Sequence, residues 1–174
     1  IYCTPATAEL VELLLRDSAH LQEEEARYAN KKKSSHHVPA KPLFNIHDAE
    51  SALQLLEVRK FGVPFSPAPG FEAEFTRAGH ILGAASVRIV ENGVSLLVSG
   101  DLGQNGDLVM HAPDSPPEAD YVLIESTYGD RLHDKGDPFE EIEKVVTKTI
   151  GNGGSVLFPA FAVGRSQVLM HILA

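Results

Sequence analysis

The 174-residue chain is long enough for a domain with a real core, and 43% hydrophobic with 22% charged residues is a globular composition. The single cysteine excludes an internal disulfide framework and, with no signal peptide or apolar run of roughly 18 residues visible, predicts a cytoplasmic protein without a transmembrane helix. The formal charge of −9 argues against a general basic nucleic-acid-binding surface, although a bound cation could still attract phosphate locally.

The N-terminal residues predict a strand end followed by a helix. Residues 1–4 read as the end of a buried strand, and Thr7 is a plausible N-cap for a helix over residues 8–15. This helix can continue into the glutamates at 23–25. His20 on the helix is better explained as a solvated residue than as part of a site.

A polar segment and a second helix follow. Residues 30–42 predict a surface linker, and a mobile solvated loop is the favoured interpretation. Alternatively, His36 and His37 could bind a metal, and the lysines of this segment could bind an acidic ligand. Asp48 can cap a helix over residues 49–60. Residues 61–70, which are rich in proline, connect it to the next strands.

Three strands with two turns are predicted between residues 71 and 98. Residues 71–76 alternate apolar and polar side chains with the period of a half-buried strand. Residues 86–91 form the second strand and residues 94–98 the third. Asn92-Gly93 between them is a strong hairpin signal, because both turn positions need a positive φ.

His80 follows the first of these strands and Asp101 follows the third. In an up-down-up meander both strands end at the same edge, two strand spacings or about 10 Å apart, so the side chains could share a metal ion. Glycines that permit sharp turns and close backbone approach flank both: Gly79, Gly83, Gly100 and Gly103. The alternative is a histidine and an aspartate in ordinary turns.

A third polar group, Glu125, ends the short apolar strand predicted at 120–125. It could cap the following turn or pair with an arginine, or it could orient a histidine or a metal-bound group. A helix is predicted over 138–150, with a buried face: Ile142, Val145, Val146 and Ile150. A buried strand at 155–159 and a glycine-containing turn at 161–166 lead into a last helix, whose first N–H groups could bind phosphate.

Four motifs carry a family resemblance: GHILGA (79–84), SGDLG (99–103), IESTYGDR (124–131) and FPAFAVGRSQ (158–167). In this order and spacing they resemble the metallo-β-lactamase-fold nucleases with a β-CASP insertion, which include RNA-processing enzymes and cleavage-and-polyadenylation endonucleases. The resemblance implies an α/β fold, part of a metallo-β-lactamase αββα sandwich plus the beginning of a β-CASP domain. The implied division is 1–130 for the first part and 131–174 for the second.

The resemblance also implies roles for single residues. His80 matches a zinc ligand, and Asp101 matches the catalytic aspartate that bridges two zinc ions in a complete site. Glu125 matches a catalytic acidic residue that positions a histidine further along the family's chain. Arg165 matches a position near the RNA-binding cleft. The implied activity is zinc-dependent hydrolysis of RNA, and a homodimer is left open.

One departure from the family is large, because the signature His-x-His-x-Asp-His does not occur in this sequence. We therefore expect an internal fragment with an incomplete zinc site that binds zinc poorly and does not cleave RNA by itself. Two alternatives stay open for the intact protein. One is another hydrolase of the same fold, such as a thioester hydrolase or lactonase, and the other is a non-catalytic scaffold subunit.

Overall fold

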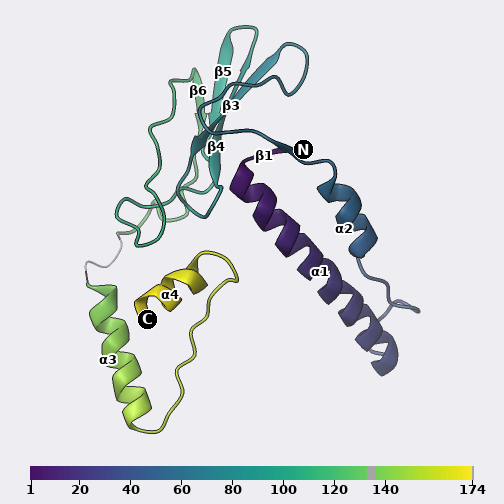
Figure 1. Cartoon of the computed structure of the whole chain (residues 1–174), viewed down its shortest axis with the longest axis vertical. Helices are drawn as coiled ribbons and strands as arrows, with labels where there is room; N and C mark the ends of the chain where they lie inside the picture. Colours follow the sequence, from purple (N-terminus) through teal and green to yellow (C-terminus); the bar gives the residue numbers. More distant parts are fainter. Residues whose placement is uncertain (133–135, 174) are drawn as a thin grey trace.

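A computed structural model describes residues 1–132 and 136–173, so residues 133–135 and 174 of the expected second domain lie outside the described residues. The chain contains both helices and β-sheets, as predicted for an α/β fold (Figure 1). In chain order the elements are β1 (Tyr2–Cys3), α1 (Pro5–Lys32), α2 (Ile46–Leu53), β2 (Glu57–Val58), β3 (Phe71–Arg77), β4 (Ala85–Glu91), β5 (Val94–Val98), β6 (Tyr121–Leu123), α3 (Pro138–Gly151) and α4 (Arg165–Leu173).

The predicted meander is confirmed, and it forms a sheet of order β3-β4-β5-β6. β3, β4 and β5 pair antiparallel in sequence, and β6 adds parallel to β5. Asn92 and Gly93 have φ of 51° and 80°, the left-handed values that the tight turn between β4 and β5 requires. β3, β5 and β6 therefore run in one direction and end at the same edge.

The start of α1 differs from the prediction. Thr4, not Thr7, is the N-cap, and its hydroxyl accepts a hydrogen bond from the Thr7 N–H at 3.3 Å. Pro5 fits the first helical position, where its missing N–H costs nothing. α1 then continues to Lys32, the third residue of the segment predicted as a linker, and its C-cap Lys33 has a left-handed conformation.

The second helix also lies elsewhere than predicted. α2 begins after Asn45, which is its N-cap, and Asp48 completes a capping box as the third helical residue. The helix ends at Leu53 rather than at residue 60, because Glu57 and Val58 form β2 and pair parallel with Tyr2 and Cys3 of β1. Pairing with a distant segment has overridden the local helical pattern.

The core is small and centres on the sheet and the connector before it. Phe65 of the connector packs between Tyr2 and Phe75, with ring centroids 5.0 and 5.2 Å apart. Buried apolar side chains of the sheet and its turn surround this contact: Ala73, Phe75, Ala78 and Leu97. This aromatic contact fixes β1, and through it the start of α1, against the sheet.

For the C-terminal part, the prediction of two helices is confirmed, whereas the prediction of a buried helix face is wrong. α3 begins at Pro138 with Asp137 as N-cap, and α4 follows the turn at 161–164. The face of α3 predicted as buried is not buried; Val145 is 54% exposed and Ile150 63% exposed. The predicted strand at 155–159 does not form, since within the described ranges no strand pairs with it.

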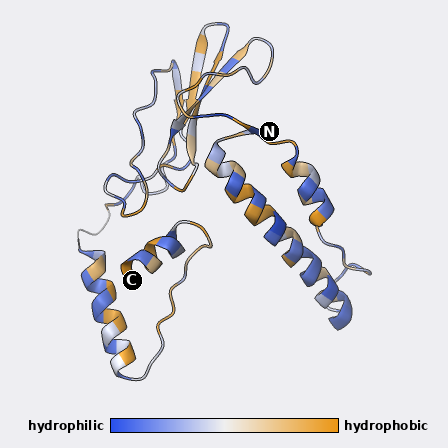
Figure 2. Cartoon of the chain, viewed as in Figure 1, coloured by the Kyte–Doolittle hydropathy of each residue, from blue (hydrophilic) through white to orange (hydrophobic). Residues whose placement is uncertain are grey.

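Hydrophobic and hydrophilic residues are interspersed along α3, whereas the C-terminal end of α1 is almost entirely hydrophilic (Figure 2). Among the helices in residues 1–132 and 136–173, none combines the length and the apolar composition that crossing a bilayer would require.

Candidate functional site

His80, Asp101 and Glu125 emerge at one edge of the sheet because each follows one of three strands that run in the same direction. The His80 Nε2 atom lies 4.0 Å from the Asp101 Oδ2 atom. Both side chains remain accessible, with 47% of His80 and 75% of Asp101 exposed. The predicted meeting of this histidine and aspartate is confirmed, whereas their role as metal ligands stays a prediction.

The turns that carry these two residues are joined through their backbones. Gly79 and Leu102 form an isolated antiparallel bridge, and the Gly103 N–H donates to the Ala78 carbonyl at 2.8 Å. A Cβ on Gly103 would lie 2.0 Å from the Gly79 carbonyl oxygen. Only glycine permits this approach, so the predicted use of glycines for close backbone contact is met at this position.

Glu125 holds the turn after Asp101 in place. Its Oε1 accepts a hydrogen bond from the Leu102 N–H at 2.9 Å, and its Oε2 accepts one from the Thr127 N–H at 3.2 Å. The Leu102 N–H first, then Thr127 and the nearby His80, hold the pKa of the Glu125 carboxyl below its ordinary value. The ionised carboxylate therefore positions Leu102, the residue after Asp101. The predicted pairing of Glu125 with a catalytic histidine stays a prediction.

The loop after His80 is anchored on the first turn of α1. Buried Thr4 donates its hydroxyl to the Gly83 carbonyl at 2.8 Å, and Thr7 donates to the same oxygen at 3.1 Å. Gly83 has a φ of 86°, and a Cβ there would lie 2.5 Å from the Thr7 nitrogen. The two threonines were not expected in the site, and only the T-x-x-T spacing before a helix could have indicated them.

A hollow of about 310 Å³ lies between α1 and this loop and includes His80 and Asp101 in its wall. The rest of the wall is mainly apolar: Thr7, Leu10, Val11, Leu14, Ile81, Leu82, Ala84 and Ala85. A ligand bound by the His80–Asp101 pair would thus have an apolar surface beside it.

The start of α4 lies close to the same loop. A Cβ on Gly164 would be 3.2 Å from the Cγ2 atom of Ile81, which follows His80. Arg165, the next residue, is exposed at the first position of α4, and its predicted RNA contact stays a prediction. The Gly164 N–H already donates to the Gln167 side chain at 2.7 Å, so this N–H is not available for the phosphate binding predicted at the helix start.

Comparison with known proteins decides the family. No family model matches the chain. It is 34% identical to a ribonuclease of Thermus thermophilus and 28% identical to an RNase J-like protein of Methanocaldococcus jannaschii, in each case over 99% of the chain. It is also 40% identical to cleavage and polyadenylation specificity factor 73 of Drosophila melanogaster, over 55% of the chain and 14% of that protein. The chain belongs to the metallo-β-lactamase-fold, β-CASP nuclease family.

This β-CASP family chain spans 36% and 38% of the lengths of the Thermus and Methanocaldococcus relatives. An imidazole nitrogen and a carboxylate oxygen 4.0 Å apart are donors of the kind that zinc and related divalent metals bind. Within the part of the chain that the structure describes, however, no group of three or more histidine, cysteine, aspartate or glutamate side chains could hold a metal. The chemistry of His80 and Asp101 suits two ligands of a metal site, but the two residues do not form a complete site.

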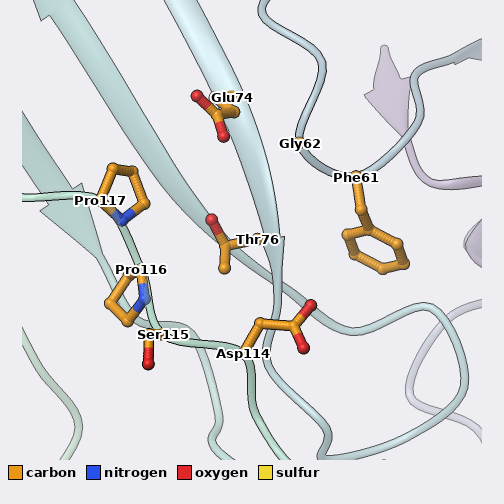
Figure 3. A pocket seen from close by; sticks show the side chains of 8 residues that line it. All are labelled: Phe61, Gly62, Glu74, Thr76, Asp114, Ser115, Pro116 and Pro117. Atoms are coloured by element: carbon orange, nitrogen blue, oxygen red, sulfur yellow. The ribbon is translucent and has the colours of Figure 1, made fainter.

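A second hollow, of about 340 Å³, lies on the side of β3 that faces the residue 114–117 loop (Figure 3). Glu74 and Thr76 of β3 line it together with Asp114, and the Arg77 Nη1 atom lies 3.3 Å from the Asp114 Oδ1 atom. Phe61 closes one side beneath the Arg77 guanidinium, 5.5 Å from the ring centroid. The ion pair with Arg77 gives Asp114 a structural role in this hollow.

Proposed function

We propose that this β-CASP chain is one section of a zinc-dependent ribonuclease that hydrolyses RNA phosphodiester bonds. The observation that supports the proposal most directly is the placement of His80 and Asp101, 4.0 Å apart, at the edge where Glu125 also emerges. The Thermus relative is named as a ribonuclease and matches 99% of the chain. RNA is accordingly the proposed substrate and zinc the proposed metal.

Each residue has a definite task in this proposal. His80 would supply a neutral imidazole nitrogen and Asp101 two carboxylate oxygens to the metal site. Bound zinc would supply Lewis-acid stabilisation of the phosphoryl oxygens and lower the pKa of a water. Glu125 keeps the Asp101 turn in position through the Leu102 N–H. Arg165 would contact an RNA phosphate from the start of α4.

The same proposal divides the chain near residue 130, with 1–130 in the metallo-β-lactamase part and 131–174 in the β-CASP part. It is compatible with the contact of Gly164 and Ile81, which places the start of α4 near the His80 loop. A cytoplasmic location, supported by the single cysteine, belongs to the proposal as well, and a homodimer stays a prediction.

The test is RNA cleavage by two forms of the protein, the 174-residue chain and a form extended to the length of its relatives. The extended form should cleave RNA, lose cleavage with a chelator, and lose it with Asp101→Asn. Asp17→Asn, an exposed carboxylate on α1, is the matched control and should keep full activity. The 174-residue chain should not cleave RNA. Cleavage by a folded Asp101→Asn variant at the unmodified rate would contradict the proposal, and an extended form without any cleavage would favour the scaffold alternative.

A further inference from the structure

A strongly basic surface lies at the far end of α1, in a chain whose formal net charge is −9. No aspartate or glutamate occurs from residue 26 to residue 47. The same segment contains exposed cations that we call the basic tip: Arg27, Lys31, Lys32, Lys33 and Lys41. The local charge is therefore opposite to that of the molecule as a whole.

The basic tip has a defined geometry because the loop after α1 is bound to the helix. The Asn30 amide donates to the Ala40 carbonyl at 2.8 Å and accepts from the Ala40 N–H at 2.8 Å. The Leu43 N–H donates to the Gln22 side chain at 3.4 Å. These bonds bring Lys41 back beside the end of the helix, so the lysines form one surface and not a charge run along a free loop.

An aromatic side chain lies within the basic tip. Tyr28 is 63% exposed, and the Lys32 Nζ atom lies 5.9 Å from its ring centroid. Positive groups for phosphates beside an exposed ring for a base are the combination that binds single-stranded nucleic acid. The charge and the ring thus favour RNA as the occupant over an anionic surface that presents no bases.

The distance between the basic tip and the candidate site is set by one rigid element. α1 has 28 residues and is about 42 Å long, and its first turn is fixed to the Gly83 carbonyl next to the His80 loop. Acidic side chains occupy the helix between its two ends: Glu9, Glu12, Asp17, Glu23, Glu24 and Glu25. They disfavour phosphate along the helix, so an RNA would contact its two ends and bridge the middle.

We propose that the basic tip is a second RNA-docking surface, about 40 Å from the His80–Asp101 pair, which holds a part of the RNA that is not being cleaved. The inference rests on the proposed function, since RNA is the substrate of that proposal. At about 3.4 Å per stacked nucleotide, bridging this distance takes roughly 12 nucleotides. A stacked RNA shorter than that cannot occupy both ends of α1 at once.

The experiment compares two triple variants of equal net charge. Lys31→Gln/Lys32→Gln/Lys41→Gln neutralises the basic tip and leaves Lys33, the C-cap of α1, unchanged. Lys60→Gln/Lys144→Gln/Lys148→Gln neutralises three exposed lysines elsewhere. Binding of single-stranded RNA of about 6 and about 30 nucleotides, lengths on either side of the bridging estimate, is followed by fluorescence anisotropy at several salt concentrations on the full 174-residue chain.

The tip variant should bind the long RNA at least tenfold more weakly at 0.1 M salt, since each phosphate contact contributes about fivefold there. Its slope of log K against log salt should become shallower by about 2, at about 0.7 per contact. The control variant should keep the affinity and slope of the unmodified chain. Tyr28→Leu should weaken long-RNA binding by about tenfold with an unchanged slope, because stacking does not release counterions.

Equal long-RNA binding by the tip variant and the control would overturn the inference. Binding of the tip to phosphatidylserine vesicles without binding to RNA would overturn it as well. The result is separable from that of the proposed function. If the extended form cleaves RNA but the tip variant binds RNA as well as the control, this inference alone is wrong. If RNA binding depends on the tip lysines but the extended form cleaves no RNA, the proposed function alone is wrong.

Discussion

Replacing Gly103 with alanine tests whether the two turns of the candidate site are in direct backbone contact. The added Cβ would lie 2.0 Å from the Gly79 carbonyl oxygen, 2.3 Å from the Gly79 carbonyl carbon and 2.8 Å from the His80 nitrogen. Ordinary contacts between carbon and its neighbours are about 3.5 Å or more. All three neighbours are backbone atoms, so no side-chain rotation can relieve the overlap. The turns that carry His80 and Asp101 must move apart by more than about 1 Å.

The cost has two parts. Overpacking of this kind costs about 1–3 kcal/mol. Separating the turns also breaks the hydrogen bond from the Gly103 N–H to the Ala78 carbonyl, which adds about 1 kcal/mol. We expect Gly103→Ala to lower the free energy of unfolding by about 2–4 kcal/mol.

Urea unfolding followed by circular dichroism measures this change. Gly151→Ala is the matched control, because its Cβ would meet no atom within 4 Å at the last residue of α3. Alanine there should be neutral or stabilise the chain by about 0.4–1 kcal/mol. If Gly103→Ala costs less than about 0.5 kcal/mol, the close contact of the two turns does not exist and the site geometry derived from it is wrong.

Three further predictions concern the elements around the site. Thr7→Val should cost about 1 kcal/mol in urea unfolding, because it removes one of the two hydroxyls that bind the Gly83 carbonyl. An unchanged midpoint would show that Thr4 suffices. Gly93→Ala should lower the free energy of unfolding by about 1–2 kcal/mol, because its φ of 80° is unfavourable for alanine even though no atom lies within 4 Å of the added Cβ. A stabilised variant would contradict the left-handed conformation of this turn. Hydrogen bonds from Ser95 lower the pKa of Asp120, so its contribution to stability is present above the ordinary carboxyl pKa and is lost as pH falls through the lowered one. The urea midpoints of the unmodified chain and Asp120→Asn should therefore converge below about pH 4 and stay apart at pH 6.

The meeting of His80 with Asp101 could be predicted because its causes are local. The alternation over residues 71–76 and the Asn92-Gly93 turn fix the strand directions, and the directions place both residues at one edge. The 4.0 Å distance could not be predicted, since it depends on the bridge of Gly79 and Leu102 and on Glu125 as a backbone acceptor. Both are contacts between segments that are far apart in the sequence.

Thr7 has the chemistry of an N-cap, but Pro5 begins the helix and Thr4 directly before it takes the capping position. Two other errors share one physical reason, which is whether a distant strand is present as a partner. The helical pattern expected to reach residue 60 ends early because Glu57 and Val58 pair with β1. Conversely, the sequence of 155–159 favours a strand, but in the described parts of the chain it has no strand to pair with. Local patterns predict which structure is possible, and tertiary partners decide which one forms.

The most direct test of the central claim is the zinc content of the protein extended to the length of its relatives, measured by elemental analysis beside its Asp101→Asn variant. If His80 and Asp101 are ligands of a two-metal site, the unmodified protein should contain about two zinc ions per chain and the folded variant clearly fewer. Equal zinc content in the two proteins, or a folded protein without zinc, would contradict the assignment of Asp101 as a metal ligand.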